Sequence, residues 1–173
     1  MLVHVPLCTH PNPQKILLVG CPSLAKQIKK HHNIDAVSID DNSALIKEQT
    51  GVYDIIITRT KVDPKEVHRV LNKKGLAAIE SKSYWEDFGI LRKELFEFAE
   101  LFNIAMPYKV EGYVILEMRG NIFVSKKYHP TADMILHKID LLDGLVYYNS
   151  DNHIASFVLP KGINEELLPI MKK

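Results

Sequence analysis

Over its first hundred residues the chain alternates short apolar runs with amphipathic segments. Four runs have the length and composition of buried strands, at residues 15–20, 34–40, 53–58 and 76–81. Near-continuous apolar runs such as KILLVG at 15–20 are typical of strands that are covered on both faces. Helical patterns separate or follow them, at residues 22–30, 42–49, 63–75 and 84–102. This alternation predicts an open α/β layer built on parallel strands.

Local signals place the ends of several of these helices. Asp63 is expected to cap the third helix, with Pro64 at the first helical position and Gly75 at the carboxyl end. Asn42 or Ser43 is expected to cap the short helix at 42–49. Residues 1–7 read as the last turns of a helix, which the following THPNP ends because proline restricts its own backbone and that of its neighbour.

The pattern changes in the last third of the chain. Three strand-like runs follow one another, at 104–109, 112–119 and 121–127, and Gly120-Asn121 between the last two is a hairpin signal. Two further helices are expected at 134–142 and 163–171. We therefore expect a mostly parallel sheet that is closed by an antiparallel C-terminal hairpin.

In open α/β sheets, ligands bind outside the carboxyl ends of the strands. The positions that this rule selects are the strand ends at 20–23, 39–41, 58–63 and 80–82, and the segment from Tyr108 onward. The rule says where a site lies and leaves its chemistry open.

Composition narrows the class of protein. The chain has 173 residues, 46% of them hydrophobic, which fits one globular domain over 1–173, and a net charge of +1 offers no attraction to nucleic acid or an anionic membrane. No apolar run spans a bilayer and no leader pattern follows Met1, so we expect a cytoplasmic protein. Cys8 and Cys21 are expected to be thiols, and since neither CxxC nor HExxH occurs, no metal site is predicted.

Two separated stretches resemble the spermidine synthase family. Residues 1–20, MLVHVPLCTHPNPQKILLVG, look like the family's helix that runs through THPNP into the first strand. Residues 147–161, YYNSDNHIASFVLPK, are similar to its YYN-x-x-x-H-x-A-x-F-x-LP signature. The resemblance covers essentially the whole chain and implies a methyltransferase-like Rossmann fold with three layers.

The resemblance also implies an activity. The family, the polyamine aminopropyltransferases, moves an aminopropyl group from decarboxylated S-adenosylmethionine to putrescine, giving spermidine and methylthioadenosine. The adenosyl compound is a co-substrate, so no separate cofactor is implied. The expected partners are these small molecules, together with further copies of the chain in a homodimer or other oligomer.

The adenosyl pocket departs from the family pattern. Where the family has a glycine-rich GGGDGG, this chain has Gly20-Cys21-Pro22-Ser23-Leu24-Ala25, whose side chains add bulk. Ser38 stands in place of the ribose-binding glutamate, whereas Asp40 is retained. The resemblance thus makes Gly20, Cys21, Ser38 and Asp40 the candidates for holding the adenosyl group. The stretch from Asp40 to Tyr53 is also short, which predicts the loss of one edge strand.

The catalytic and amine-binding positions also depart from the family pattern. Arg59 occupies the position of the family's catalytic base, and Asp63 and Glu80 are the remaining candidates for that role. Glu80 and Tyr108 match amine-binding positions. Each residue also has a structural interpretation: Asp63 as a helix cap and Tyr108 as a packed aromatic. Arg59 beside Lys61 is expected to pair with Asp40 or to recognise an anionic group.

The residues of the C-terminal signature also have structural interpretations. Tyr147, Tyr148 and Phe157 are expected to pack, and Asn149 and His153 to hold their loop by hydrogen bonds.

Three hypotheses remain open at this point. The first is a divergent spermidine synthase whose pocket is rebuilt around Asp40, Glu80 and Tyr108. The second is a catalytically silent homologue that acts as a binding or assembly partner, since the lost edge strand and the absent N-terminal β-domain of the family would leave apolar surface to cover. The third is that the chain is a fragment of a longer enzyme.

Overall fold

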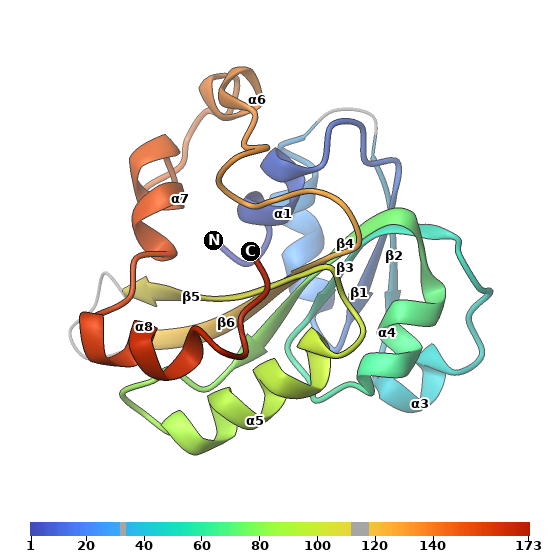
Figure 1. Cartoon of the computed structure of the whole chain (residues 1–173). Helices are drawn as coiled ribbons and strands as arrows, with labels where there is room; N and C mark the ends of the chain where they lie inside the picture. Colours follow the sequence, from blue (N-terminus) through green and yellow to red (C-terminus); the bar gives the residue numbers. More distant parts are fainter. Residues whose placement is uncertain (32–33, 112–117) are drawn as a thin grey trace.

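The protein is a three-layer α/β sandwich, seen here in a computed structural model that describes residues 1–31, 34–111 and 118–173 (Figure 1). The central sheet has six strands in the order β2-β1-β3-β4-β6-β5. The strands are β1 (Lys15–Val19), β2 (Asp35–Ile39), β3 (Tyr53–Thr58), β4 (Leu71–Ser81), β5 (Ile104–Glu111) and β6 (Met118–Ser125). The first four pair in parallel, and β6 runs antiparallel to both β4 and β5. The expected fold class is confirmed.

Helices cover both faces of the sheet (Figure 1). The elements are α1 (His4–Thr9), η1 (Pro22–Leu24), α2 (Ala25–Ile28), α3 (Asn42–Leu45), α4 (Pro64–Val70), α5 (Phe88–Ala99), α6 (Leu136–Asp140), α7 (Ser150–Ser156) and α8 (Lys161–Leu167). Side chains of α3, α4, α5 and α8 join one buried cluster, and side chains of α1, α2 and α6 join the other. Neighbouring strand residues alternate between the clusters: Ile16 and Leu18 belong to one, Leu17 and Val19 to the other. This period of two explains why the strands had to be apolar on both sides.

The amino-terminal part of the sheet matches the expected elements closely. Residues 40–52, all of them described, contain α3 and no strand, so β2 is an edge strand as expected. Asp63 caps α4 by accepting the Lys65 amide at 2.9 Å. The cap of α3 is Asp41, where Asn42 or Ser43 was predicted, because the extended backbone of Asp41 lets its carboxylate reach the amides of Ser43 and Ala44.

Two glycines do not have the predicted roles. Gly75 does not end a helix: α4 stops at Val70, and Gly75 lies inside β4, where a Cβ would come within 2.9 Å of the Leu71 side chain. Gly120-Asn121 does not form a turn: β6 runs through both residues, paired with Ser81 and Glu80 of β4. A Cβ on Gly120 would lie 2.1 Å from the Lys82 carbonyl oxygen, so this glycine permits close backbone approach. The hairpin instead joins β5 to β6, and the predicted strand at 112–119 falls mostly outside the described residues.

Candidate functional site

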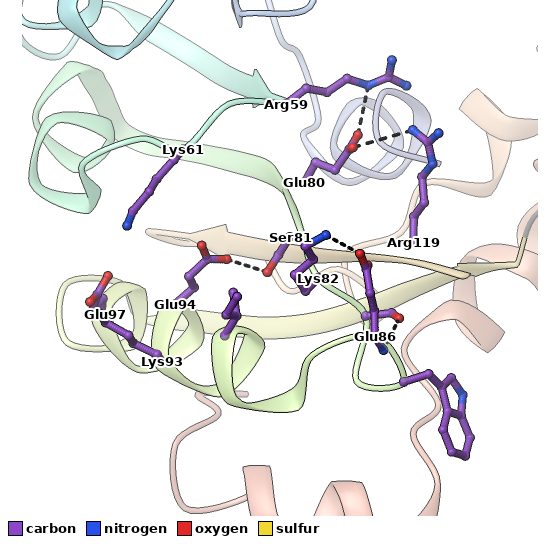
Figure 2. A pocket seen from close by; sticks show the side chains of 13 residues that line it. Arg59, Lys61, Glu80, Ser81, Lys82, Glu86, Lys93, Glu94, Glu97 and Arg119 are labelled. Carbon is purple, nitrogen blue, oxygen red and sulfur yellow. Dashed lines mark hydrogen bonds and ion pairs between the residues drawn. The ribbon is translucent and has the colours of Figure 1, made fainter. Parts of the chain in front are cut away.

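A crevice of about 950 Å³ opens where β3 and β4 end (Figure 2). We call it the strand-end crevice. Arg59 and Lys61 enter it from the end of β3, residues 80–83 from the end of β4, and Arg119 from β6. The polar side of α5 forms the opposite wall, with Lys93, Glu94 and Glu97. Parallel strands end here side by side, which is where an open α/β sheet binds its ligands.

Glu80 lies between two arginines in this crevice. Its carboxylate is 3.0 Å from Arg59 Nε and 3.6 Å from Arg119 Nη1 (Figure 2). The expected pair of Arg59 with Asp40 is wrong, because β1 separates β2 from β3 whereas β4 is the direct neighbour of β3. The strand order therefore brings Arg59 to Glu80.

The wall formed by α5 carries carboxylates that the sequence interpretation missed. Glu94 accepts a hydrogen bond from the Ser81 hydroxyl at 2.5 Å, and Glu97 lies one helical turn further (Figure 2). Both are half-buried and lie beside the stripe of Leu91, Leu95 and Phe98, which are in the core. Their spacing of three on the polar side of an amphipathic helix was a usable signal.

The turn after β1 lies outside the strand-end crevice. Gly20 has φ of 64°, and its amide donates to the Ile39 carbonyl at 3.0 Å. A Cβ there would lie 2.3 Å from Thr60 Cγ2, so the turn is packed against the chain that leaves β3. Cys21 is buried, its thiol donates to the Ile57 carbonyl, and burial raises the pKa of that thiol.

The remaining adenosyl candidates are Ser38 and Asp40. Both are exposed at the edge strand β2 or directly after it, and neither lines the strand-end crevice. None of these candidates lines the strand-end crevice around Glu80, and their roles in holding an adenosyl group stay predictions.

Two further candidates occupy structural positions. Asp63 caps α4 and does not line the crevice. Tyr108 is fully buried in β5 and stacks on Phe157 with ring centroids 5.1 Å apart, and burial raises the pKa of its hydroxyl. The structure places this ring in the core. Contact between Tyr108 and an amine stays a prediction.

The C-terminal signature holds the chain together around α7. Asn149 caps that helix by accepting the Asn152 amide at 2.7 Å. His153 is buried, with Nδ1 2.8 Å from the Tyr148 hydroxyl and Nε2 2.9 Å from the Pro130 carbonyl oxygen. Burial lowers the pKa of this imidazole to about 4, so it is neutral at pH 7 and hydrogen-bonded at both ends.

The described part of the chain contains neither a cluster of metal ligands nor a helix suited to span a membrane. Across residues 1–31, 34–111 and 118–173, no three His, Cys, Asp or Glu side chains gather as metal ligands would. None of the described helices combines the length and apolarity that a membrane span requires.

Comparison with known proteins brings sequence and fold together. No family model matches the chain. A polyamine aminopropyltransferase of Helicobacter acinonychis is 34% identical over 118 residues, covering 66% of this chain and 45% of that protein. The polyamine aminopropyltransferase of Alkaliphilus metalliredigens is 24% identical and aligns with 96% of this chain and 76% of that protein.

The chain is similar in sequence and in fold to the polyamine aminopropyltransferases, as a divergent relative of them. It spans less than half the length of the first curated relatives that it matches. A spermidine synthase crystallised with the transition-state analogue AdoDATO superimposes with a TM-score of 0.86 at 22% identity, covering 98% of this chain and 74% of that one. The aminopropyltransferase fold therefore extends over the whole described chain.

Proposed function

We propose that this chain is a member of the aminopropyltransferase family and transfers an aminopropyl group from decarboxylated S-adenosylmethionine to a diamine, with putrescine as the simplest acceptor. The observation that carries the proposal is the strand-end crevice, whose α5 wall presents carboxylates to a ligand at the site favoured by this fold. A cationic amine needs such carboxylates for binding and for loss of its proton.

The reaction sets clear demands on the crevice. The amine nitrogen forms a bond to the aminopropyl carbon while the carbon–sulfur bond breaks. The electron pair of the carbon–sulfur bond stays on the sulfur of methylthioadenosine. The attacking nitrogen must first lose a proton to a base. Glu94 and Glu97 are suited to hold the diamine, because among the described residues neither has an ion-pair partner within 4 Å. We expect the donor to approach from the side of β1 and Gly20, where the resemblance to the family predicts the adenosyl group.

Product formation tests the proposal directly. The purified chain is incubated with putrescine and the decarboxylated donor, and methylthioadenosine is measured. We expect turnover, and we expect Glu94→Gln to lower kcat/KM for putrescine at least about tenfold through the loss of a charged hydrogen bond. Glu100→Gln is the matched control, since Glu100 follows α5 and does not line the crevice. Absence of methylthioadenosine from the unaltered chain would contradict the proposal.

A second candidate is a catalytically silent homologue that binds or assembles with a partner. It is favoured by the two guanidinium groups on Glu80, and by apolar side chains exposed in the lining of the crevice, with Trp85 66% and Ile90 41% exposed. Sedimentation and the product assay separate the two candidates. Monomeric behaviour together with turnover would eliminate the silent homologue.

Assembly and location complete the proposal. We expect a homodimer or another oligomer, which the same sedimentation experiment measures. A cytoplasmic location agrees with the two unpaired thiols, Cys8 and Cys21, that the chain buries.

A further inference from the structure

A second cavity, of about 960 Å³, lies at the end of the sheet opposite the strand-end crevice. We call it the strand-start pocket. Its lining comes from the chain before β1, the starts of β3 and β4, the end of α4 and the chain after β6, which runs antiparallel and ends where β4 begins. The two cavities share no lining residue. What the strand-start pocket binds is therefore independent of the proposed transfer reaction.

Ammonium groups dominate the charge of the strand-start pocket. Lys73 and Lys74 line it from the start of β4 and Lys126 from the chain after β6, and Asp54 is the one carboxylate in its described lining. Asp54 already accepts three hydrogen bonds from amide groups. None of the three lysines has an ion pair in the part of the chain that the structure describes. The side chains outside that part include two carboxylates, too few to outnumber these lysines.

Lys126 is held in place by the protein but has no counter-ion. Its ammonium group donates to the carbonyl oxygens of His68 and Leu71, both at 2.7 Å. The side chain is half-buried, and burial lowers the pKa of the ammonium. An ammonium group has three N–H donors, so one remains for a ligand. Because a charge removed from water is costly unless it is paired, an anion in the pocket would stabilise this group.

His10 adds unmet hydrogen-bonding capacity to the same lining. Its ring is 5% exposed and packs edge-on against Tyr128, with ring centroids 5.1 Å apart. Neither ring nitrogen has a hydrogen-bond partner among the described residues. Buried polar atoms in native proteins nearly always have a partner, from the protein or from a bound molecule. This side of the pocket is therefore incomplete without an occupant.

Arg69, the other cation in the lining, indicates which anion fits. Each of its three side-chain nitrogens donates to a protein oxygen, and it pairs with Glu66 at 2.7 Å. The pocket thus has no free guanidinium fork, the group that matches a carboxylate with two parallel hydrogen bonds. Ammonium groups act as separate point charges and are common ligands of phosphate.

We propose that the strand-start pocket binds a small polyvalent anion of the phosphate class, held by Lys73, Lys74 and Lys126. The ligand neutralises the half-buried ammonium of Lys126 and the two exposed ammonium groups beside it.

Inorganic pyrophosphate is the probe, because it carries several charges and has no adenosyl group that could enter another site. Calorimetric titration of the full chain is expected to show one saturable site, whose Kd rises as sodium chloride is added, because salt screens the exposed lysines. Citrate, a polyvalent carboxylate, is expected to bind at least about tenfold more weakly.

Two variants assign the site. The double variant Lys73→Gln, Lys74→Gln is expected to raise the Kd for pyrophosphate at least about tenfold, and both side chains are exposed, so the fold is retained. Lys126→Gln is expected to raise the Kd by a similar factor. The matched control is Lys47→Gln, Lys65→Gln, which removes the same charge from exposed positions outside the pocket and is expected to change the Kd less than about twofold.

The outcomes decide the proposal whatever the transferase assay shows. Absence of saturable binding, an unchanged Kd in the double variant, or an equal rise in the control would each overturn the site. Citrate binding as tight as pyrophosphate binding would overturn the phosphate class. Should Lys126→Gln fail to fold, the double variant and its control still decide.

Discussion

Gly20 and Gly51 both have positive φ angles, of 64° and 72°, but only Gly20 is crowded. A Cβ on Gly20 would meet Thr60 at 2.3 Å, whereas a Cβ on Gly51 would have nothing within 4 Å. The two positions therefore distinguish the cost of backbone strain from the cost of a steric clash.

We expect Gly51→Ala to lower the free energy of unfolding by about 1 kcal/mol, the cost of a left-handed backbone for a residue with a side chain. Gly20→Ala introduces the same backbone strain and must also displace Thr60. We therefore expect it to lower the free energy of unfolding by about 2–4 kcal/mol. Urea denaturation of both variants measures the difference. Equal losses would show that the turn yields to a methyl group and is less closely packed than described.

Two buried tyrosines make a second comparison at this scale. In the described part of the chain the Tyr108 hydroxyl is buried without a hydrogen-bond partner, while the Tyr148 hydroxyl lies 2.8 Å from His153 Nδ1. We expect Tyr108→Phe to leave the free energy of unfolding unchanged or to raise it, and Tyr148→Phe to lower it by about 1–3 kcal/mol. Thermal or urea unfolding checks both. A large loss for Tyr108→Phe would reveal a partner for its hydroxyl, such as a bound amine or water.

At the scale of the element, a glycine in β6 led to the wrong prediction of a turn. Gly120-Asn121 has the composition of a hairpin turn, yet the strand passes straight through it. The glycine is required because β6 passes closely over the chain after β4, at Lys82. A contact between residues so far apart in sequence leaves no local pattern to read.

Gly120→Ala is expected to lower the free energy of unfolding by at least about 2 kcal/mol, because its Cβ would lie 2.1 Å from a backbone oxygen that cannot move without shifting β4. Gly89→Ala, in the first turn of α5, is expected to act in the opposite direction. There the nearest atom is at 3.4 Å, and alanine favours the helix by up to about 1 kcal/mol. Denaturation of both variants tests the close approach of β6 against a general intolerance of added methyl groups.

At the scale of the whole molecule, three buried histidines couple folding to pH. Burial lowers the pKa of His4 to about 3 and the pKa values of His10 and His153 to about 4. Each imidazole is neutral in the folded chain and takes up a proton near pH 6.5 when the chain unfolds. Between pH 6.5 and 4 the unfolded state therefore binds more protons, and stability falls as the pH falls.

His153→Gln isolates one of these contributions. The full contribution of His153 is present above pH 6.5 and is lost on acidification toward pH 4, by up to about 3 kcal/mol. We expect the free energy of unfolding of the variant to depend less steeply on pH over this window than that of the unaltered chain. Parallel slopes would mean that His153 is not neutral and buried as described.

The candidate site could be predicted in part. Glu80 was placed correctly at a strand end, since the end of an apolar run is visible in the sequence. Its partners Arg59 and Arg119 could not be paired with it in advance, because that requires the order β3-β4-β6. Glu94 was readable from the polar face of α5, but nothing local places that helix beside Ser81.

The sequence by itself determined the succession of strands and helices, the two-sided burial of the sheet, and the cap at Asp63. These follow from side-chain period and capping chemistry, which act over a few residues. Only the tertiary structure decided that Arg59 faces Glu80 and not Asp40, that Gly120 lies within a strand, and that Glu94 lies beside Ser81. Each of these depends on which strands are neighbours, and strand order is set by packing between distant segments.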